Sequence, residues 1–135
     1  MIAGNPFLGW WNMRLKNILL VVSDVEQSKK FYHDLFDLQV INDNKDYVMM
    51  SEGLVLQGQK TWEQLIDSNT VIGNASELFF VENDFDAFLL KIKNIVEEQS
   101  INVRNNSWGK RVVMLKDPDG HLIEVAEGAK GPVDL

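Results

Sequence analysis

Glu124 is the residue of this chain whose setting points most directly to chemistry. It is the only carboxylate in the otherwise mostly apolar run His121-Leu122-Ile123-Glu124-Val125-Ala126. In a strand, Leu122, Glu124 and Ala126 would share one face and the other three residues the opposite face. A carboxylate between Leu and Ala is either a solvated polar residue or the floor of a cavity.

The four residues that precede this run predict a tight turn. Asp117-Pro118-Asp119-Gly120 places Asp at the first position, Pro with its fixed φ at the second and Gly at the fourth, as a type I turn favours. The turn therefore predicts a hairpin that ends in the strand carrying Glu124.

The chain carries the same pattern of elements twice. Each half reads as a strand, a helix and three short strands, and the two capping residues Asp24 and Asp84 are sixty positions apart. In the first half we expect strands at Lys16–Val22, Gln39–Asn42, Tyr47–Ser51 and Leu54–Gln59 around a helix at Val25–Phe36. In the second half we expect strands at Glu77–Glu82, Asn102–Asn105, Arg111–Lys116 and Leu122–Ala126 around a helix at Phe85–Glu97. Duplicated halves that close on each other create a cleft between them.

Both helices have start signals and an apolar stripe. Asp24 is a good N-cap with Gln27 at capping-box spacing, and Asp84 opens the second helix in the same way. The aromatic residues of each stripe are best explained as core between helix and sheet.

Composition excludes several classes of protein. The 135 residues are 45% hydrophobic, which is enough for one domain with a real core. There is no cysteine, so disulfides, thiolate metal sites and a cysteine nucleophile are excluded. The net charge of −7 argues against nucleic acid or an anionic membrane as a partner, and favours a small neutral or cationic ligand. No apolar run suits a membrane span or an export signal, so we expect a cytoplasmic protein.

The segments outside the repeat differ from it in composition. Residues 1–13 combine Gly4, Pro6 and Gly9 with Phe7, Leu8, Trp10 and Trp11, so they are either an added extension or an arm that packs on this chain or on a partner. A short helix or lid-like connector is predicted within Lys60–Gly73. Residues 128–135 form a tail without periodicity.

Residues 14–127 resemble the vicinal oxygen chelate superfamily, which includes glyoxalase I, bleomycin-resistance proteins and extradiol dioxygenases. The resemblance rests on the run Asn17–Asp24, on Ser28, Phe31 and Tyr32, and on the Asp117–Glu124 hairpin. It implies an α+β fold of two βαβββ modules whose mixed sheets form paired half-barrels with the helices outside, commonly as a homodimer. A homodimer is also expected because short strands leave edges to cover and the arm is apolar.

The resemblance also implies a ligand set. The four positions that hold a divalent cation in metal-dependent members fall on Asn17, Gln57, Glu77 and Glu124. Two amides are weak donors, and His33 and His121 are not placed to replace them, so we expect no resident metal and keep a divalent cation held by Glu77 and Glu124 as the alternative. Without a cation the two carboxylates would repel, and one that takes up a proton could act as a general acid or base.

Other residues are expected to line the pocket. Strand alternation adds Tyr47, Met49 and Phe79, and Trp108 is a candidate ligand contact in a hairpin loop. Arg111, with Lys110, either clamps an anionic group or lies on a solvated edge. The function expected is binding of a small amphipathic molecule, to sequester or modify it; the alternative is a metal-dependent lyase or isomerase of glyoxalase type.

Overall fold

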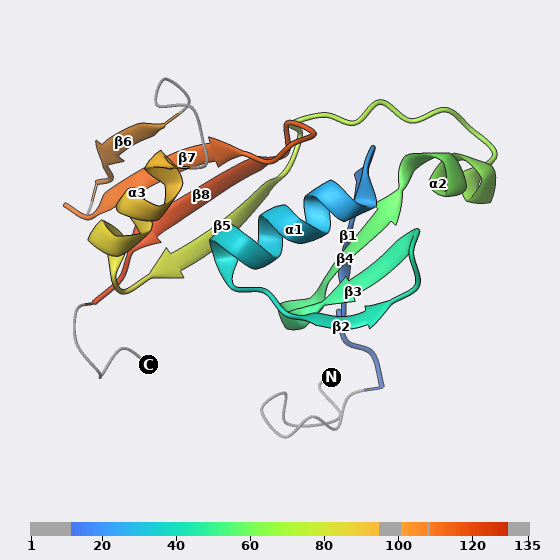
Figure 1. The fold of residues 1–135 in the computed structure, drawn as a ribbon, viewed down its shortest axis with the longest axis horizontal. Coiled ribbons are helices and arrows are strands. Elements are labelled where there is room, and N and C mark those ends of the chain that lie inside the picture. The colour runs from blue at the N-terminus through green and yellow to red at the C-terminus, as the bar shows by residue number, and fades with distance from the viewer. Residues whose placement is uncertain (1–11, 95–100, 108, 130–135) are drawn as a thin grey trace, which may run out of the picture.

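The computed structural model describes residues 12–94, 101–107 and 109–129 and shows two βαβββ modules (Figure 1). The first module contains β1 (Ile18–Val22), α1 (Val25–Phe36), β2 (Val40–Asp43), β3 (Tyr47–Met50) and β4 (Leu54–Gly58). The second contains β5 (Glu77–Glu82), α3 (Phe85–Lys93), β6 (Asn102–Asn105), β7 (Arg111–Lys116) and β8 (Leu122–Glu127). The α+β fold predicted from the repeat is confirmed.

Each module forms one four-stranded mixed sheet. The strand orders are β1-β4-β3-β2 and β5-β8-β7-β6, with the first pair of each sheet parallel and the others antiparallel. The two sheets therefore repeat one topology, in which β1 and β5 are edge strands that face the other module (Figure 1).

The helices begin at the predicted caps. The carboxylate of Asp24 accepts the N–H of Gln27 at 3.1 Å, and that of Asp84 accepts the N–H of Ala87 at 3.2 Å. Helix α1 has the predicted bounds. Residues 95–97 of the second predicted helix lie outside the described residues.

The short helix predicted between the modules is α2 (Gln59–Ile66). A 3-10 turn at Ser51–Gly53 connects β3 and β4 within the first module. Within the described part of the chain, no helix is both long and apolar enough to cross a membrane.

Each sheet has a helix face and an open face. Alternate strand residues enter the hydrophobic core beneath α1 and α3, among them Leu20, Val22, Leu56, Ile123 and Val125. The residues between them, including Leu19, Val55, Phe79 and Glu124, therefore lie on the open face. This matches the predicted faces, because Glu124 lies on the open face and His121 is buried on the other.

The predicted turn does more than connect two strands. The N–H of Gly120 donates to the carbonyl of Asp117 at 3.0 Å, which closes the expected β-turn. The same turn contacts the first module: the Tyr32 hydroxyl donates to Asp117 Oδ2 at 2.7 Å, and Asp119 Oδ1 accepts the Ser23 hydroxyl at 2.6 Å. His121 Nε2 lies 2.9 Å from the carbonyl oxygen of Val21. We call this set of contacts the junction clamp.

The contact between Tyr32 and Asp117 at the centre of the junction clamp is buried. Tyr32 is 0% exposed and Asp117 is 4% exposed, and Asp117 Oδ1 accepts the N–H groups of Asp119 and His121, each at 2.9 Å. Burial, and then the neighbouring Asp117 carboxylate, raise the pKa of the Tyr32 hydroxyl far above its ordinary value. The clamp fixes the second module against α1 and the end of β1.

Candidate functional site

The open face of the second sheet brings the two predicted catalytic carboxylates near each other. Glu77 and Phe79 lie on β5, and Phe79 pairs with Glu124 on the neighbouring strand β8. Glu77 and Glu124 are therefore diagonal neighbours on one face. Phe79 is 57% exposed and Val81, two residues further along β5, is 60% exposed. The face thus combines two carboxylates with uncovered apolar side chains.

Glu124 has an ionic partner that sequence reasoning missed. Arg104 Nη2 of β6 lies 3.7 Å from Glu124 Oε1, and it also lies 3.7 Å from the sulfur of Met114. The side chain of Arg104 is 48% exposed and that of Glu124 is 18% exposed. Asn102 pairs with Met114, and Met114 pairs with Glu124, so these three residues share one face. Arg104 lies two residues after Asn102 and therefore lies on the same face, as strand alternation in the sequence could have indicated.

In the first sheet the register changes which residue matches Glu124. In the second sheet, Glu77 lies two residues before Phe79, which pairs with Glu124. In the first sheet, Asn17 lies two residues before Leu19, which pairs with Val55. The position equivalent to Glu124 is therefore Val55, an apolar side chain that is 1% exposed. Gln57 pairs with Val21, two residues further along the strand, and so lies about 13 Å along the sheet from Asn17.

Gln57 is also occupied by contacts within its own module. It is 3% exposed, and its Nε2 donates to the carbonyl oxygen of Asp46 at 2.9 Å. Asp46 lies in the loop between β2 and β3, so the amide of Gln57 holds this loop against β4. Gln57 lies on the predicted face, but the structure gives it a structural contact.

The remaining predicted pocket residues fall in different places. Tyr47 pairs with Gln57 and Met49 with Val55, so both lie on the open face of the first sheet. Arg111 instead faces α3. Its Nη1 lies 2.9 Å from Asp86, its Nη2 lies 2.9 Å from Glu127, and its guanidinium lies over the ring of Phe85. The hydrogen bonds that its guanidinium donates to Glu127 and then to Asp86 raise its pKa above the ordinary arginine value. Trp108 lies outside the described residues.

The donor set does not fit a divalent metal held by four side chains. The first module offers the amide of Asn17 and the apolar side chain of Val55, while Gln57 is bonded to Asp46 and Glu124 is paired with Arg104. His33 is exposed beside Asp34, and His121 belongs to the junction clamp. Within the described residues, no three side chains among His, Asp and Glu are grouped so that they could hold a metal ion.

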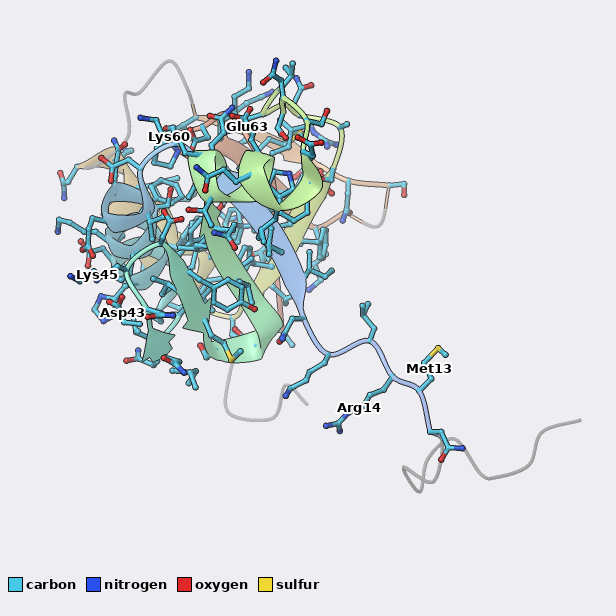
Figure 2. The ribbon with its side chains drawn as sticks, turned by 90° about the vertical axis from the view of Figure 1, so that its right-hand side faces the viewer. Met13, Arg14, Asp43, Lys45, Lys60 and Glu63 are labelled. Atoms are coloured by element: carbon cyan, nitrogen blue, oxygen red, sulfur yellow. The ribbon has the colours of Figure 1, made fainter. Side chains whose placement is uncertain are left out.

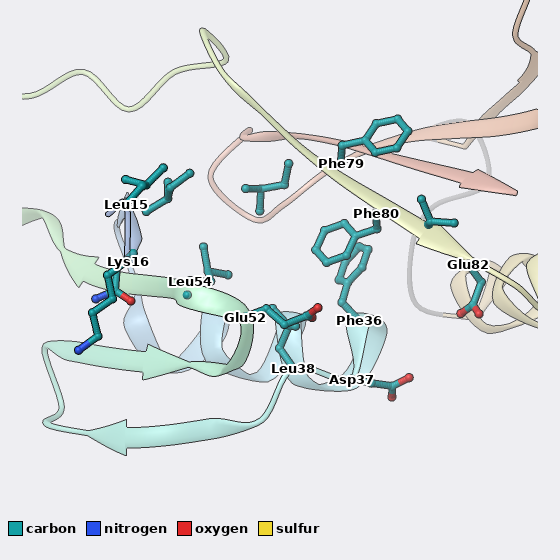
Figure 3. Close-up of a pocket in the computed structure, with 15 residues that line it drawn as sticks. Leu15, Lys16, Phe36, Asp37, Leu38, Glu52, Leu54, Phe79, Phe80 and Glu82 are labelled. Atoms are coloured by element: carbon teal, nitrogen blue, oxygen red, sulfur yellow. The ribbon is translucent and has the colours of Figure 1, made fainter. Parts of the chain in front are cut away.

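A cavity of about 750 Å³ lies where the two modules meet (Figure 3). Its walls come from the start of the first module, the end of α1, the turn before β4 and the strand β5. Phe36 and Phe80 stack there with ring centroids 4.5 Å apart, and Leu38 and Leu54 add apolar surface. Of the predicted site residues, Asn17 and Phe79 line this space, which we call the junction cavity. It joins the open face through Phe79 and Val81.

Comparison with known proteins places the chain in a family. The profile of the glyoxalase-like domain matches residues 15–130. The chain therefore belongs to the glyoxalase-like domain family, within the vicinal oxygen chelate superfamily.

Three relatives show how far the likeness extends. The crystal structure of a protein of unknown function from Agrobacterium tumefaciens is 31% identical with a TM-score of 0.76, covering 89% of this chain and 98% of that one. A probable lactoylglutathione lyase from Vibrio parahaemolyticus is 26% identical, covering 92% of this chain and 97% of that protein. The uncharacterized protein YraH from Bacillus subtilis is 25% identical, covering 84% and 97%.

Proposed function

We propose that this protein binds a small amphipathic molecule on the open face of the second sheet and in the adjoining junction cavity. The observation that carries the proposal is the exposure of Phe79 and Val81 on a strand beside Glu77 and Glu124. An exposed Phe and Val on one strand face, next to a cavity of this size, suit the apolar body of a ligand. The carboxylates suit a polar or cationic end.

The charges of the face narrow the class of ligand. Arg104 partly neutralises Glu124, whereas Glu77 is exposed at the start of β5. The whole chain carries a net charge of −7. A neutral or cationic amphipathic compound is therefore favoured over an anionic one.

The probable lactoylglutathione lyase from Vibrio parahaemolyticus supports a second candidate, a lyase or isomerase of glyoxalase type. In that case Glu124 or Glu77 would move a proton of a substrate bound against β5 and β8, since both carboxylates lie on that face. The two candidates differ in that only the lyase or isomerase would convert its ligand into a product.

A fluorescence titration with Nile red, an uncharged amphipathic dye, tests the binding proposal. Phe79→Ser should weaken dye binding about fivefold or more, because it removes part of the apolar contact surface. Leu90→Ser is the matched control, since Leu90 is 64% exposed on the outer side of α3 and should leave the affinity unchanged. Equal affinities for Phe79→Ser and the unmodified protein would place the dye elsewhere and reject the site.

Metal content and turnover separate the two candidates. The protein purified without chelator should contain far less than one nickel, zinc or manganese ion per chain and should show no lactoylglutathione lyase activity. About one ion per chain that is lost in Glu124→Gln, together with turnover, would establish the lyase and overturn the binding proposal.

A further inference from the structure

The charged residues on the open face of the second sheet are separated by sign. Among the described strand residues, the acidic Glu77 and Glu124 lie on β5 and β8, and the basic Lys116 and Arg104 lie on β7 and β6. The strand order β5-β8-β7-β6 therefore places the carboxylates on the half of the sheet nearest the first module and the cations on the outer half (Figure 1). These charges sum to zero, in a chain whose net charge is −7.

Two of these charged residues are paired with each other and two are not. Arg104 Nη2 lies 3.7 Å from Glu124 Oε1, so this pair neutralises the middle of the face. Glu77 and Lys116 are both exposed, and the side chain of neither has a hydrogen bond or an ion pair to another described residue. The charges that the face leaves for a ligand are therefore one carboxylate and one ammonium group.

Glu77 and Lys116 lie on either side of Leu122 in one row across the sheet. Glu77 pairs with Leu122 on β8, and Leu122 pairs with Lys116 on β7. Because each step between neighbouring strands is about 4.8 Å, the Cα atoms of Glu77 and Lys116 are about 10 Å apart. Leu122 is half-buried, and Phe79, the next residue of β5 on this face, is 57% exposed. Apolar surface therefore lies between and beside the two charges.

The first sheet differs from the second in this respect. Among its described strands, no residue that the register places on the open face carries a charge. Figure 2 shows charged residues of this module in other places, with Asp43 and Lys45 at the end of β2 and Lys60 and Glu63 on α2. The separated pair of charges is therefore a feature of the second sheet, and the repeat of the fold does not account for it.

We propose that the ligand is a zwitterion with an apolar linker between its two charges, bound across the strands with its cationic end at Glu77 and its anionic end at Lys116. This inference rests on the proposed function and adds Lys116 as a residue that selects the ligand. A purely cationic ligand would leave Lys116 without a partner, and a purely anionic ligand would be repelled by the carboxylates of β5 and β8. A zwitterion meets both free charges, and its net charge of zero matches that of the face.

Displacement of Nile red by two molecules of equal chain length tests this assignment. The zwitterion ω-aminooctanoic acid carries both charges, whereas octylamine carries only the cation. Each is titrated, below the concentration at which it forms micelles, against the dye bound to the unmodified protein, to Lys116→Gln and to Glu77→Gln. Lys93→Gln is the matched control, because Lys93 is exposed at the end of α3 and its substitution changes the net charge by the same amount as Lys116→Gln.

Lys116→Gln should weaken the binding of ω-aminooctanoic acid about threefold without weakening that of octylamine, because only the zwitterion has a group for Lys116. Glu77→Gln should weaken both and Lys93→Gln neither. No displacement by ω-aminooctanoic acid, equal affinities of it for Lys116→Gln and Lys93→Gln, or an equal loss for octylamine in Lys116→Gln would overturn the inference. Dye binding that Phe79→Ser does not weaken would reject the proposed function and this inference with it, whereas failure of this inference alone would leave the effect of Phe79→Ser intact.

Discussion

Replacing Tyr32 with Phe should destabilise the protein more than its small change in shape suggests. The substitution removes one hydroxyl, which is fully buried and donates to the Asp117 carboxylate at 2.7 Å across the module junction. A buried hydrogen bond to a charged group contributes about 1.5–3 kcal/mol, so we expect a loss of about 2 kcal/mol of unfolding free energy. For a chain of this length that corresponds to a fall in Tm of about 6–10 °C.

Asp117→Ala should cost more than Tyr32→Phe. Asp117 also accepts the N–H groups of Asp119 and His121. Its removal therefore leaves the buried Tyr32 hydroxyl and two N–H groups without their acceptor, which we expect to cost about 4 kcal/mol. Both losses should appear in urea denaturation followed by circular dichroism.

Tyr47→Phe is the matched control for Tyr32→Phe. Tyr47 is the only other tyrosine of the chain and is 38% exposed on the open face, so its loss of a hydroxyl should change stability by less than about 0.5 kcal/mol. A loss below about 0.5 kcal/mol for Tyr32→Phe as well would refute the reasoning, because the clamp would then contribute no more than a surface contact.

The remaining predictions concern pH, a glycine and the site. Because the pKa of Tyr32 is raised in the folded state above its ordinary value of 10.0, its contribution to stability should be intact below pH 10 and be lost as the pH rises above 10; a stability series from pH 8 to 11.5 should show a steeper loss in the unmodified protein than in Tyr32→Phe. Gly53→Ala should cost about 1–2 kcal/mol more than Gly109→Ala in thermal melts. Both glycines have positive φ, but a Cβ at Gly53 would lie 2.8 Å from the backbone oxygen of Lys16, whereas a Cβ at Gly109 would meet no atom of the described residues within 4 Å. Equal costs would contradict the close approach at Gly53. Glu124→Gln should change stability by less than about 1 kcal/mol, because its Arg104 partner is half exposed, while weakening binding of a cationic amphipathic dye about three- to tenfold; unchanged affinity with a large fall in Tm would make Glu124 a structural residue.

Most of the fold could be predicted from the sequence because the local capping and turn signals agree with the periodicity of the apolar residues. The capping residues Asp24 and Asp84, the alternating strands and the turn at Asp117 each specify geometry within a few residues, and the structure follows them. The face of Glu124 was equally predictable, since alternation within one strand fixes it.

The partners of these residues could not be predicted in the same way, because they depend on register and on contacts between modules. Gln57 and Val55 lie two residues apart on one face, and only the pairing with β1 shows that Val55 matches Glu124. Asp117 reads as a turn residue in the sequence, yet its carboxylate meets Tyr32 from 85 positions away. Arg111 reads as a candidate anion clamp, but its guanidinium is held by Asp86 and Glu127.

Equivalent turns in the two halves of the repeat have different structural roles. Five residues separate β7 from β8, and they form the junction clamp, whereas three residues separate β3 from β4. The shorter turn has no counterpart of Asp117, and the position sixty residues after Tyr32 is Ile92, which has no hydroxyl to donate.

The turn between β3 and β4 does not form an equivalent clamp with β5. Instead, Glu52 of this turn and Val81 of β5 both line the junction cavity. One end of the module junction is therefore closed by hydrogen bonds, whereas the other is open beside β5, which among the described strands pairs on one side only. Because the closed end holds the modules in place, we expect the open end to accommodate the proposed ligand while the fold is maintained.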